Sequence, residues 1–97
     1  PPGVSSEMMD KKIKSRAIRR LRIIEGQIGG LERMVEQDAY CIDVIHQSLA
    51  AKEALSSFEN LMLENHLSTH VIEQMKKGKD KKAVQEILSV YKLSRQK

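Results

Sequence analysis

One cysteine and two of the three histidines are the residues of this 97-residue chain best suited to binding a metal ion. His66 and His70 are four residues apart, so on a helix their rings lie on one face and could chelate one ion through ring nitrogens. The thiolate of Cys41 would supply a soft third ligand. The alternative is structural, because a single cysteine is often a small buried apolar residue and such histidine pairs also arise by chance. His46 lies off the face of Cys41 and is interpreted as a surface or dimer-contact residue.

The helix that must position these ligands keeps them apart within one chain. No proline interrupts the sequence from Ala39 to Gly78, and Gly78 is the first stop signal, so one long helix is predicted. Cys41 and His66 are 25 residues apart in it, which corresponds to about 37 Å. In an antiparallel dimer, the start of this helix lies beside the end of the same helix in the partner. The predicted site is therefore shared between subunits, and each dimer would carry two.

The remaining sequence predicts two further helices. A first helix runs to about Gln37, because its apolar residues recur at spacings of three and four; they are Ile13, Ala17, Leu21, Ile24, Ile28, Leu31 and Val35. Asp38 is expected to be the N-cap of the second helix. A short third helix is predicted around residues 83–91. Residues 1–6 are expected to be a flexible leader, and residues 7–97 a single all-helical domain.

Composition favours an all-α fold that needs a partner. Hydrophobic residues make up 40% of the chain but aromatic residues only 3%, and a chain this short buries a modest core. Three unequal helices do not close a bundle alone. Two copies can form an antiparallel four-helix-bundle dimer core, which would assemble further to a dimer of dimers. One cysteine, no apolar run that could span a membrane and no signal peptide favour the cytoplasm.

Basic residues are concentrated at both ends of the sequence. Residues 10–22 hold seven basic residues against Asp10 alone, and residues 76–97 hold eight against Asp80 and Glu86. Repeated by symmetry, such segments would attract phosphates, which favours double-stranded DNA as the partner over a membrane. The alternative is an ordinary solvated helix face. No helix-turn-helix, zinc-finger or RNA-binding motif is present, so groove readout is not predictable.

Two other classes of function remain open from composition alone. Cys41 with a histidine could act as nucleophile and base in an enzyme, although a helical bundle with few aromatic residues offers no obvious substrate pocket. The chain could also be a helical DNA-binding or interaction protein without any metal response. In that case DNA binding would not depend on the base sequence of the DNA, and substitution of Cys41 would leave it unchanged.

Two segments resemble the copper-sensitive operon repressor family (CsoR/RcnR) over nearly the whole expected domain. They are RRLRIIEGQIGGLERMVEQDAYCIDVIHQSLAAKEAL and ENHLSTHV. The first-helix signature is matched by Arg20, Leu21, Arg22, Ile24, Glu25, Gly26, Gln27 and Gly30, and the second-helix signature by Tyr40, Cys41, Ile42, Asp43, Gln47, Ala50 and Leu55. The resemblance implies a metal-responsive transcriptional repressor that releases operator DNA when metal binds.

The resemblance implies a Cys41, His66, His70 ligand set. Copper sensors of the family most often have cysteine at the last position, and its nickel and cobalt sensors have histidine with a further histidine near the N-terminus. This chain lies between the two groups. One thiolate and two imidazoles suit trigonal Cu(I), which is favoured here over Zn(II), Ni(II) and Co(II). Persulfide sensors need two cysteines and are excluded, whereas a formaldehyde sensor using Pro1 or Pro2 stays an alternative.

The resemblance also implies residue roles around the ligands and on the DNA face. Tyr40 and Glu86 would hydrogen-bond the free ring nitrogen of His66 and link ligation to the third helix, although Glu86 could be an ordinary exposed acid. The residues expected to contact DNA are basic residues of the first helix, namely Arg16, Arg19, Arg20 and Arg22, with Lys12 and Lys14 as electrostatic support. The oligomer, a homodimer or homotetramer, would dock this face on its operator.

Overall fold

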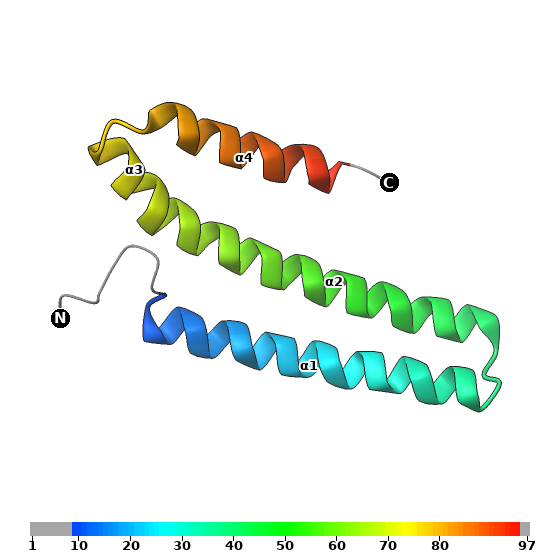
Figure 1. Cartoon of the computed structure of the whole chain (residues 1–97). Helices are drawn as coiled ribbons and strands as arrows, with labels where there is room; N and C mark the ends of the chain where they lie inside the picture. The colour runs from blue at the N-terminus through cyan, green and yellow to red at the C-terminus, as the bar shows by residue number, and fades with distance from the viewer. Residues whose placement is uncertain (1–8, 96–97) are drawn as a thin grey trace. The chain divides into compact units, whose positions relative to one another are not determined.

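The computed structural model describes residues 9–95, and almost all of them are helical (Figure 1). The elements are α1 (Lys11–Glu36), α2 (Cys41–His66), the π-helical turn η1 (Leu67–Val71), α3 (Ile72–Lys76) and α4 (Asp80–Ser94). Because α2, η1 and α3 follow one another without a gap, the described residues form three helical segments and no strand. The all-α class and the long second helix are confirmed. The expected leader, residues 1–6, lies outside the described residues.

Contacts divide the described chain into two compact units. One is Met9–Glu64, which holds α1 and nearly all of α2, and the other is the described part of Asn65–Lys97, which holds η1, α3 and α4. The metal-ligand candidates His66 and His70 belong to the second unit, whereas Cys41 belongs to the first. The single domain over residues 7–97 stays a prediction.

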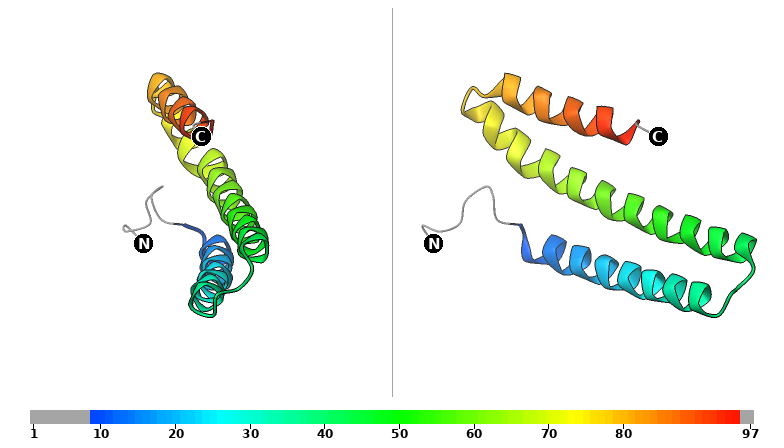
Figure 2. Two further views of the ribbon diagram at one scale, coloured as in Figure 1. Left: turned by 90° about the vertical axis from the view of Figure 1, so that its right-hand side faces the viewer. Right: turned by 45° about the vertical axis from the view of Figure 1, so that its right-hand side comes forward.

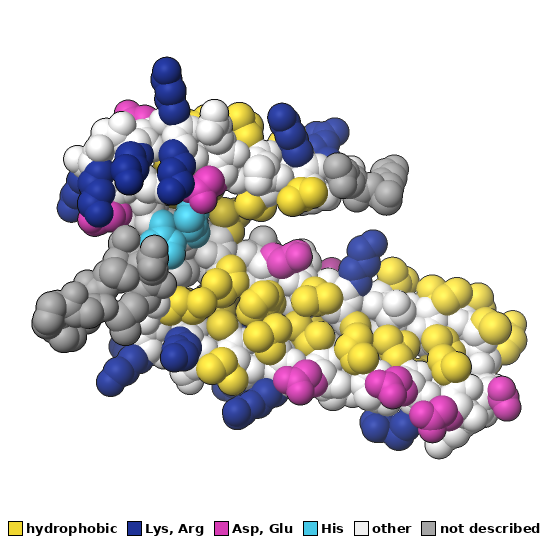
Figure 3. Space-filling view, in the orientation of Figure 1, with side chains coloured by type: hydrophobic (Ala, Val, Ile, Leu, Met, Phe, Trp, Pro, Cys, Tyr) yellow, Lys and Arg dark blue, Asp and Glu magenta, His cyan; other side chains and the backbone are white. Residues whose placement is uncertain are grey.

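In the first unit, α1 and α2 run antiparallel as a long hairpin (Figure 2). Asp10 caps α1, because its carboxylate accepts a hydrogen bond from the backbone N–H of Lys12 at 3.0 Å. The side chains buried in this unit are small or aliphatic, namely Ala17, Ile24, Ala51 and Leu61. Many other apolar side chains of the hairpin stay exposed, and Figure 3 shows them as a continuous band over α1 and α2. Among residues 9–95, the hairpin therefore keeps a largely exposed apolar face.

The turn between α1 and α2 corrects the prediction for Asp38. Asp38 does not cap α2, which begins three residues later at Cys41. It has a φ of 57°, and the backbone N–H groups of Asp38 and Ala39 donate to the carbonyls of Val35 and Met34. This is a Schellman motif, in which a left-handed residue satisfies the last carbonyls of a helix. Asp38 thus ends α1, because the capping requirement of the first helix prevails over the N-cap preference of aspartate.

The helical run that begins at Cys41 ends where the sequence predicts. Gly78 has a φ of +72°, and the N–H groups of Gly78 and Lys79 donate to the carbonyls of Met75 and Gln74 in a second Schellman motif. The third helix, α4, then begins at Asp80 and extends to Ser94, beyond the predicted residues 83–91. No described helix has the length and apolar character needed to cross a membrane.

The π-helical turn was not predicted and has a local cause. The hydroxyls of Ser68 and Thr69 both donate to the backbone carbonyl of Asn65, at 3.2 and 2.6 Å. Such hydroxyls compete with the backbone N–H that would otherwise bind this carbonyl in an α-helix. Single π turns inside α-helices are frequent at functional sites. This one begins directly after His66 and contains His70.

Candidate metal centre and basic helix face

The rings of His66 and His70 meet across the π turn. Their Nδ1 atoms are 3.0 Å apart, and the rings meet edge to face with centroids 5.0 Å apart. Which Nδ1 is the hydrogen-bond donor and which the acceptor depends on the tautomer of each ring. Both side chains are partly buried. Because two imidazole nitrogens converge on one point, the pair fits a metal ion held by histidine nitrogens.

Cys41 is placed differently from the histidines. It is the first residue of α2, whereas His66 is the last, and its side chain is exposed. Within the described part of one chain, no three residues of the His, Cys, Asp and Glu types gather closely enough to hold an ion. The structure thus brings two of the three predicted ligands together in one chain. Tyr40, just before Cys41, is 71% exposed.

Glu86 of α4 belongs to the surroundings of the histidine pair. Its Oε1 accepts a hydrogen bond from Nε2 of Gln74 at 2.7 Å. This bond is the main cause that lowers the pKa of Glu86 below its ordinary value; burial opposes it, and Lys82, His66 and His70 each add a smaller lowering effect. Glu86 is therefore an ionised partner of the site. Sequence reasoning does not single out Gln74, although its position four residues after His70 is a usable signal.

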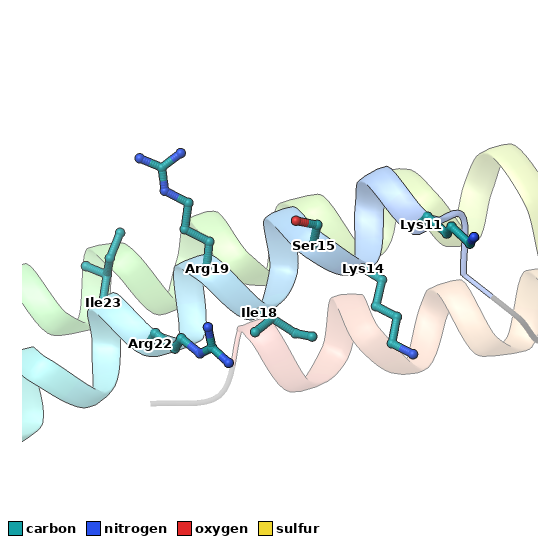
Figure 4. A pocket seen from close by; sticks show the side chains of 7 residues that line it. All are labelled: Lys11, Lys14, Ser15, Ile18, Arg19, Arg22 and Ile23. Atoms are coloured by element: carbon teal, nitrogen blue, oxygen red, sulfur yellow. The ribbon is translucent and has the colours of Figure 1, made fainter.

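Five of the six predicted DNA contacts are free and exposed on α1. Arg19 and Arg22 line one surface hollow together with Lys14 and the half-exposed Ile18 and Ile23. Figure 4 shows the long basic side chains extending from α1 around Ile18. Lys12 and Arg16 are also exposed. These basic side chains are therefore exposed on α1, and their contact with DNA stays a prediction.

Arg20, the sixth predicted contact, is engaged within the hairpin. Its Nη1 donates to the backbone carbonyl of Ser57 at 2.8 Å and lies 3.0 Å from the Ser57 hydroxyl oxygen. Its side chain is only partly exposed. Arg20 thus links α1 to α2, a role that the sequence alone does not predict.

Comparison with known proteins gives consistent matches over most of the chain. A family model described as metal-sensitive transcriptional repressor matches residues 13–92. The copper-sensing transcriptional repressor CsoR of Bacillus subtilis (strain 168) is 37% identical over 81 residues, which cover 84% of this chain and 80% of that protein. The copper-sensing transcriptional repressor RicR of Mycobacterium tuberculosis (strain ATCC 25618 / H37Rv) is 43% identical over 65 residues, which cover 67% of this chain and 68% of that protein.

A solved structure has the same fold. The crystal structure of the copper-sensing repressor CsoR with Cu(I) from Geobacillus thermodenitrificans NG80-2 matches with a TM-score of 0.85. Its sequence is 30% identical, and the match covers 92% of this chain and 93% of that chain.

Proposed function

Since the chain belongs to the metal-sensitive transcriptional repressor family, we propose that its metal-free form binds operator DNA and that Cu(I) releases it. Membership implies DNA binding and oligomeric assembly. It also excludes the two other classes considered, an enzyme using Cys41 and a helical protein without metal response. Release of the DNA would allow expression of copper efflux or homeostasis genes in the cytoplasm.

The observation that carries the proposal is the pair of histidine Nδ1 atoms 3.0 Å apart. With the thiolate of Cys41 they form a donor set of one sulfur and two nitrogens, which suits a soft ion of low coordination number. The copper-sensing relatives also favour Cu(I) as the bound metal. Nickel, cobalt or zinc would need further ligands from water or backbone and remain the competing metals. The formaldehyde alternative depends on Pro1 and Pro2, which lie outside the described residues.

We place the complete site between two subunits. Helix α2 begins with Cys41 and ends with His66, so antiparallel packing of two α2 helices would bring the thiolate of one chain to the histidines of the other. The apolar band over α1 and α2 supports such a dimer (Figure 3), in which the two hairpins would form a four-helix bundle. Two dimers would then form the tetramer.

The DNA-binding face is proposed to be the basic surface of α1. Arg16, Arg19 and Arg22 would contact phosphates or groove edges of double-stranded operator DNA, with Lys12 and Lys14 in support. The coupling of the two ligands is reciprocal, so DNA must weaken metal binding by the same factor by which metal weakens DNA binding.

The test is an anaerobic titration of the reduced protein with Cu(I) against a competing chelator, followed by release of fluorescent operator DNA. Tight stoichiometric binding with release is expected, and Cys41→Ala or His66→Ala should abolish the response while preserving DNA binding without metal. His46→Ala is the matched control, because His46 is exposed on α2. This variant should release DNA on Cu(I) binding as the unaltered protein does. Release by nickel or cobalt alone would refute Cu(I) as the effector.

A further inference from the structure

The surface hollow on α1 combines basic side chains with an exposed isoleucine. Ile18 is 40% exposed, and Figure 4 shows it between Lys14 and Arg22 along the helix. The hollow is lined by four cations and no acid, namely Lys11, Lys14, Arg19 and Arg22, together with Ser15, Ile18 and Ile23. A partner that fills this hollow must therefore be anionic and must also offer an apolar group to Ile18.

Ile18 lies on a stripe of α1 that is separate from the buried face of the hairpin. The members of the stripe, spaced by four, three and four residues, are Lys11, Ser15, Ile18 and Arg22. Ala17 and Ile24 are buried, and their spacing from Ile18 places them on another face of the helix. A helix with its side chains is about 10–12 Å wide and the major groove of DNA about 12 Å. This face of α1 therefore fits the major groove.

The cations of the hollow argue against a second copy of the chain as its occupant. If two copies met symmetrically through this face, the four cations of one copy would lie against the same four of the other. The phosphates on either side of a DNA groove would instead neutralise them. The charge of the hollow thus favours double-stranded DNA, and the remaining question is which apolar group of DNA Ile18 would meet.

We propose that Ile18 determines part of the base preference of the protein by contacting the C5-methyl group of a thymine in the major groove. That methyl is the apolar group of a base pair that side chains read there. Lys14 and Arg19 flank the stripe on opposite sides and contact phosphates, while Arg22, one turn beyond Ile18, reaches a neighbouring base pair. The inference rests on the proposed function, because it takes the basic surface of α1 as the DNA-binding face.

The experiment replaces thymine by deoxyuridine, which lacks only the C5-methyl group. The metal-free protein first selects duplexes from a random-sequence library, and each thymine of the selected site is then replaced in turn. At least one replacement should weaken binding by roughly 4-fold, the value of burying one methyl group, as measured by fluorescence anisotropy. Ile18→Ala should bind the thymine and deoxyuridine duplexes equally well at that position.

Ile23→Ala is the matched control for this substitution. Ile23 is also an isoleucine of α1, is 54% exposed and lies about 140° around the helix from Ile18. The two variants lose the same atoms, so a general effect of lost apolar surface would appear in both. Ile23→Ala should keep the thymine sensitivity of the unaltered protein.

Three results would overturn the role of Ile18. They are selection of no preferred sequence, an unaltered protein that loses no affinity at any thymine, and an Ile18→Ala variant that keeps the thymine sensitivity. The second result needs no variant to fold. Release of DNA by Cu(I) without a thymine effect would refute only this inference, whereas a thymine effect without release would refute only the proposed metal response.

Discussion

Arg20 differs from its basic neighbours on α1, because its guanidinium already binds Ser57 of α2. A guanidinium has five N–H donors in a planar fork, so the Ser57 contacts leave donors available for a phosphate. Arg19 and Arg22 are exposed and line the surface hollow on α1. At the residue scale, Arg20 links α1 to α2 and keeps N–H donors for the proposed contact with DNA.

Arg20→Ala is expected to weaken DNA binding and also to lower the free energy of unfolding by about 1 kcal/mol, the usual net value of a hydrogen bond. Arg19→Ala should weaken DNA binding alone and reduce the slope of log affinity against log salt by about one. Fluorescence anisotropy over a salt series and urea unfolding measure the two effects. Equal stability of the two variants would show that the Ser57 contact does not hold the hairpin together.

The candidate site could be predicted from sequence where spacing alone decides the geometry. His66 and His70 are found together because a separation of four residues places them on one face of almost any helix. The π turn could not be predicted in the same way, because it depends on a hydrogen bond of Thr69. Spacing alone could have pointed to Gln74, but not to its hydrogen bond with Glu86. The roles of Cys41 and Tyr40 at the site remain predictions.

At the element scale, the two Schellman motifs use different residues for the same left-handed position. Gly78 adopts its φ of +72° without steric cost, whereas Asp38 adopts 57° with a side chain. A Cβ added at Gly78 would meet no atom within 4 Å, so the cost of a side chain there comes from the backbone alone. The two positions thus form a matched pair for testing helix termination.

Asp38→Gly is expected to raise the free energy of unfolding by about 0.5 to 1 kcal/mol, because glycine removes the left-handed strain at some entropic cost. Gly78→Ala should lower it by about 1 kcal/mol for the converse reason. Urea unfolding followed by circular dichroism measures both changes. Destabilisation by Asp38→Gly would instead mean that the aspartate side chain itself stabilises the turn.

The helices themselves are predictable because their signals are periodic and long. The spacing of apolar residues predicts α1, and Gly78 predicts the end of the helical run that begins at Cys41. The start of α2 was misplaced because Asp38 is both a good N-cap and a residue that tolerates the left-handed region. Local preference does not distinguish these two roles, and the requirement to end α1 decides between them.

On the scale of the whole molecule, the exposed apolar band is the feature that a single chain leaves unexplained. Ile42, Ile45 and Leu49 of α2 are each about half exposed. The sequence predicts that such a face is apolar, but periodicity carries no information about which surface covers it. The antiparallel dimer therefore remains a proposal.

Leu49→Glu should dissociate the proposed oligomer and, with it, the complete metal site, because a carboxylate in an apolar interface is costly to desolvate. Sedimentation velocity is expected to show a smaller species that no longer binds Cu(I) tightly. Ser48→Glu places the same charge one residue earlier, about 100° around the helix, and should disturb assembly less. An unchanged mass for Leu49→Glu would mean that another surface joins the subunits.

The small number of buried side chains has a consequence for the protein in the cell. The hairpin buries chiefly four side chains, Ala17, Ile24, Ala51 and Leu61. So small a core stabilises the fold of a single chain only weakly. If the apolar band is covered by a second copy, mass action makes the folded fraction depend on copy number. The melting temperature would then rise with protein concentration, and newly made subunits would become resistant to proteolysis only as they accumulate.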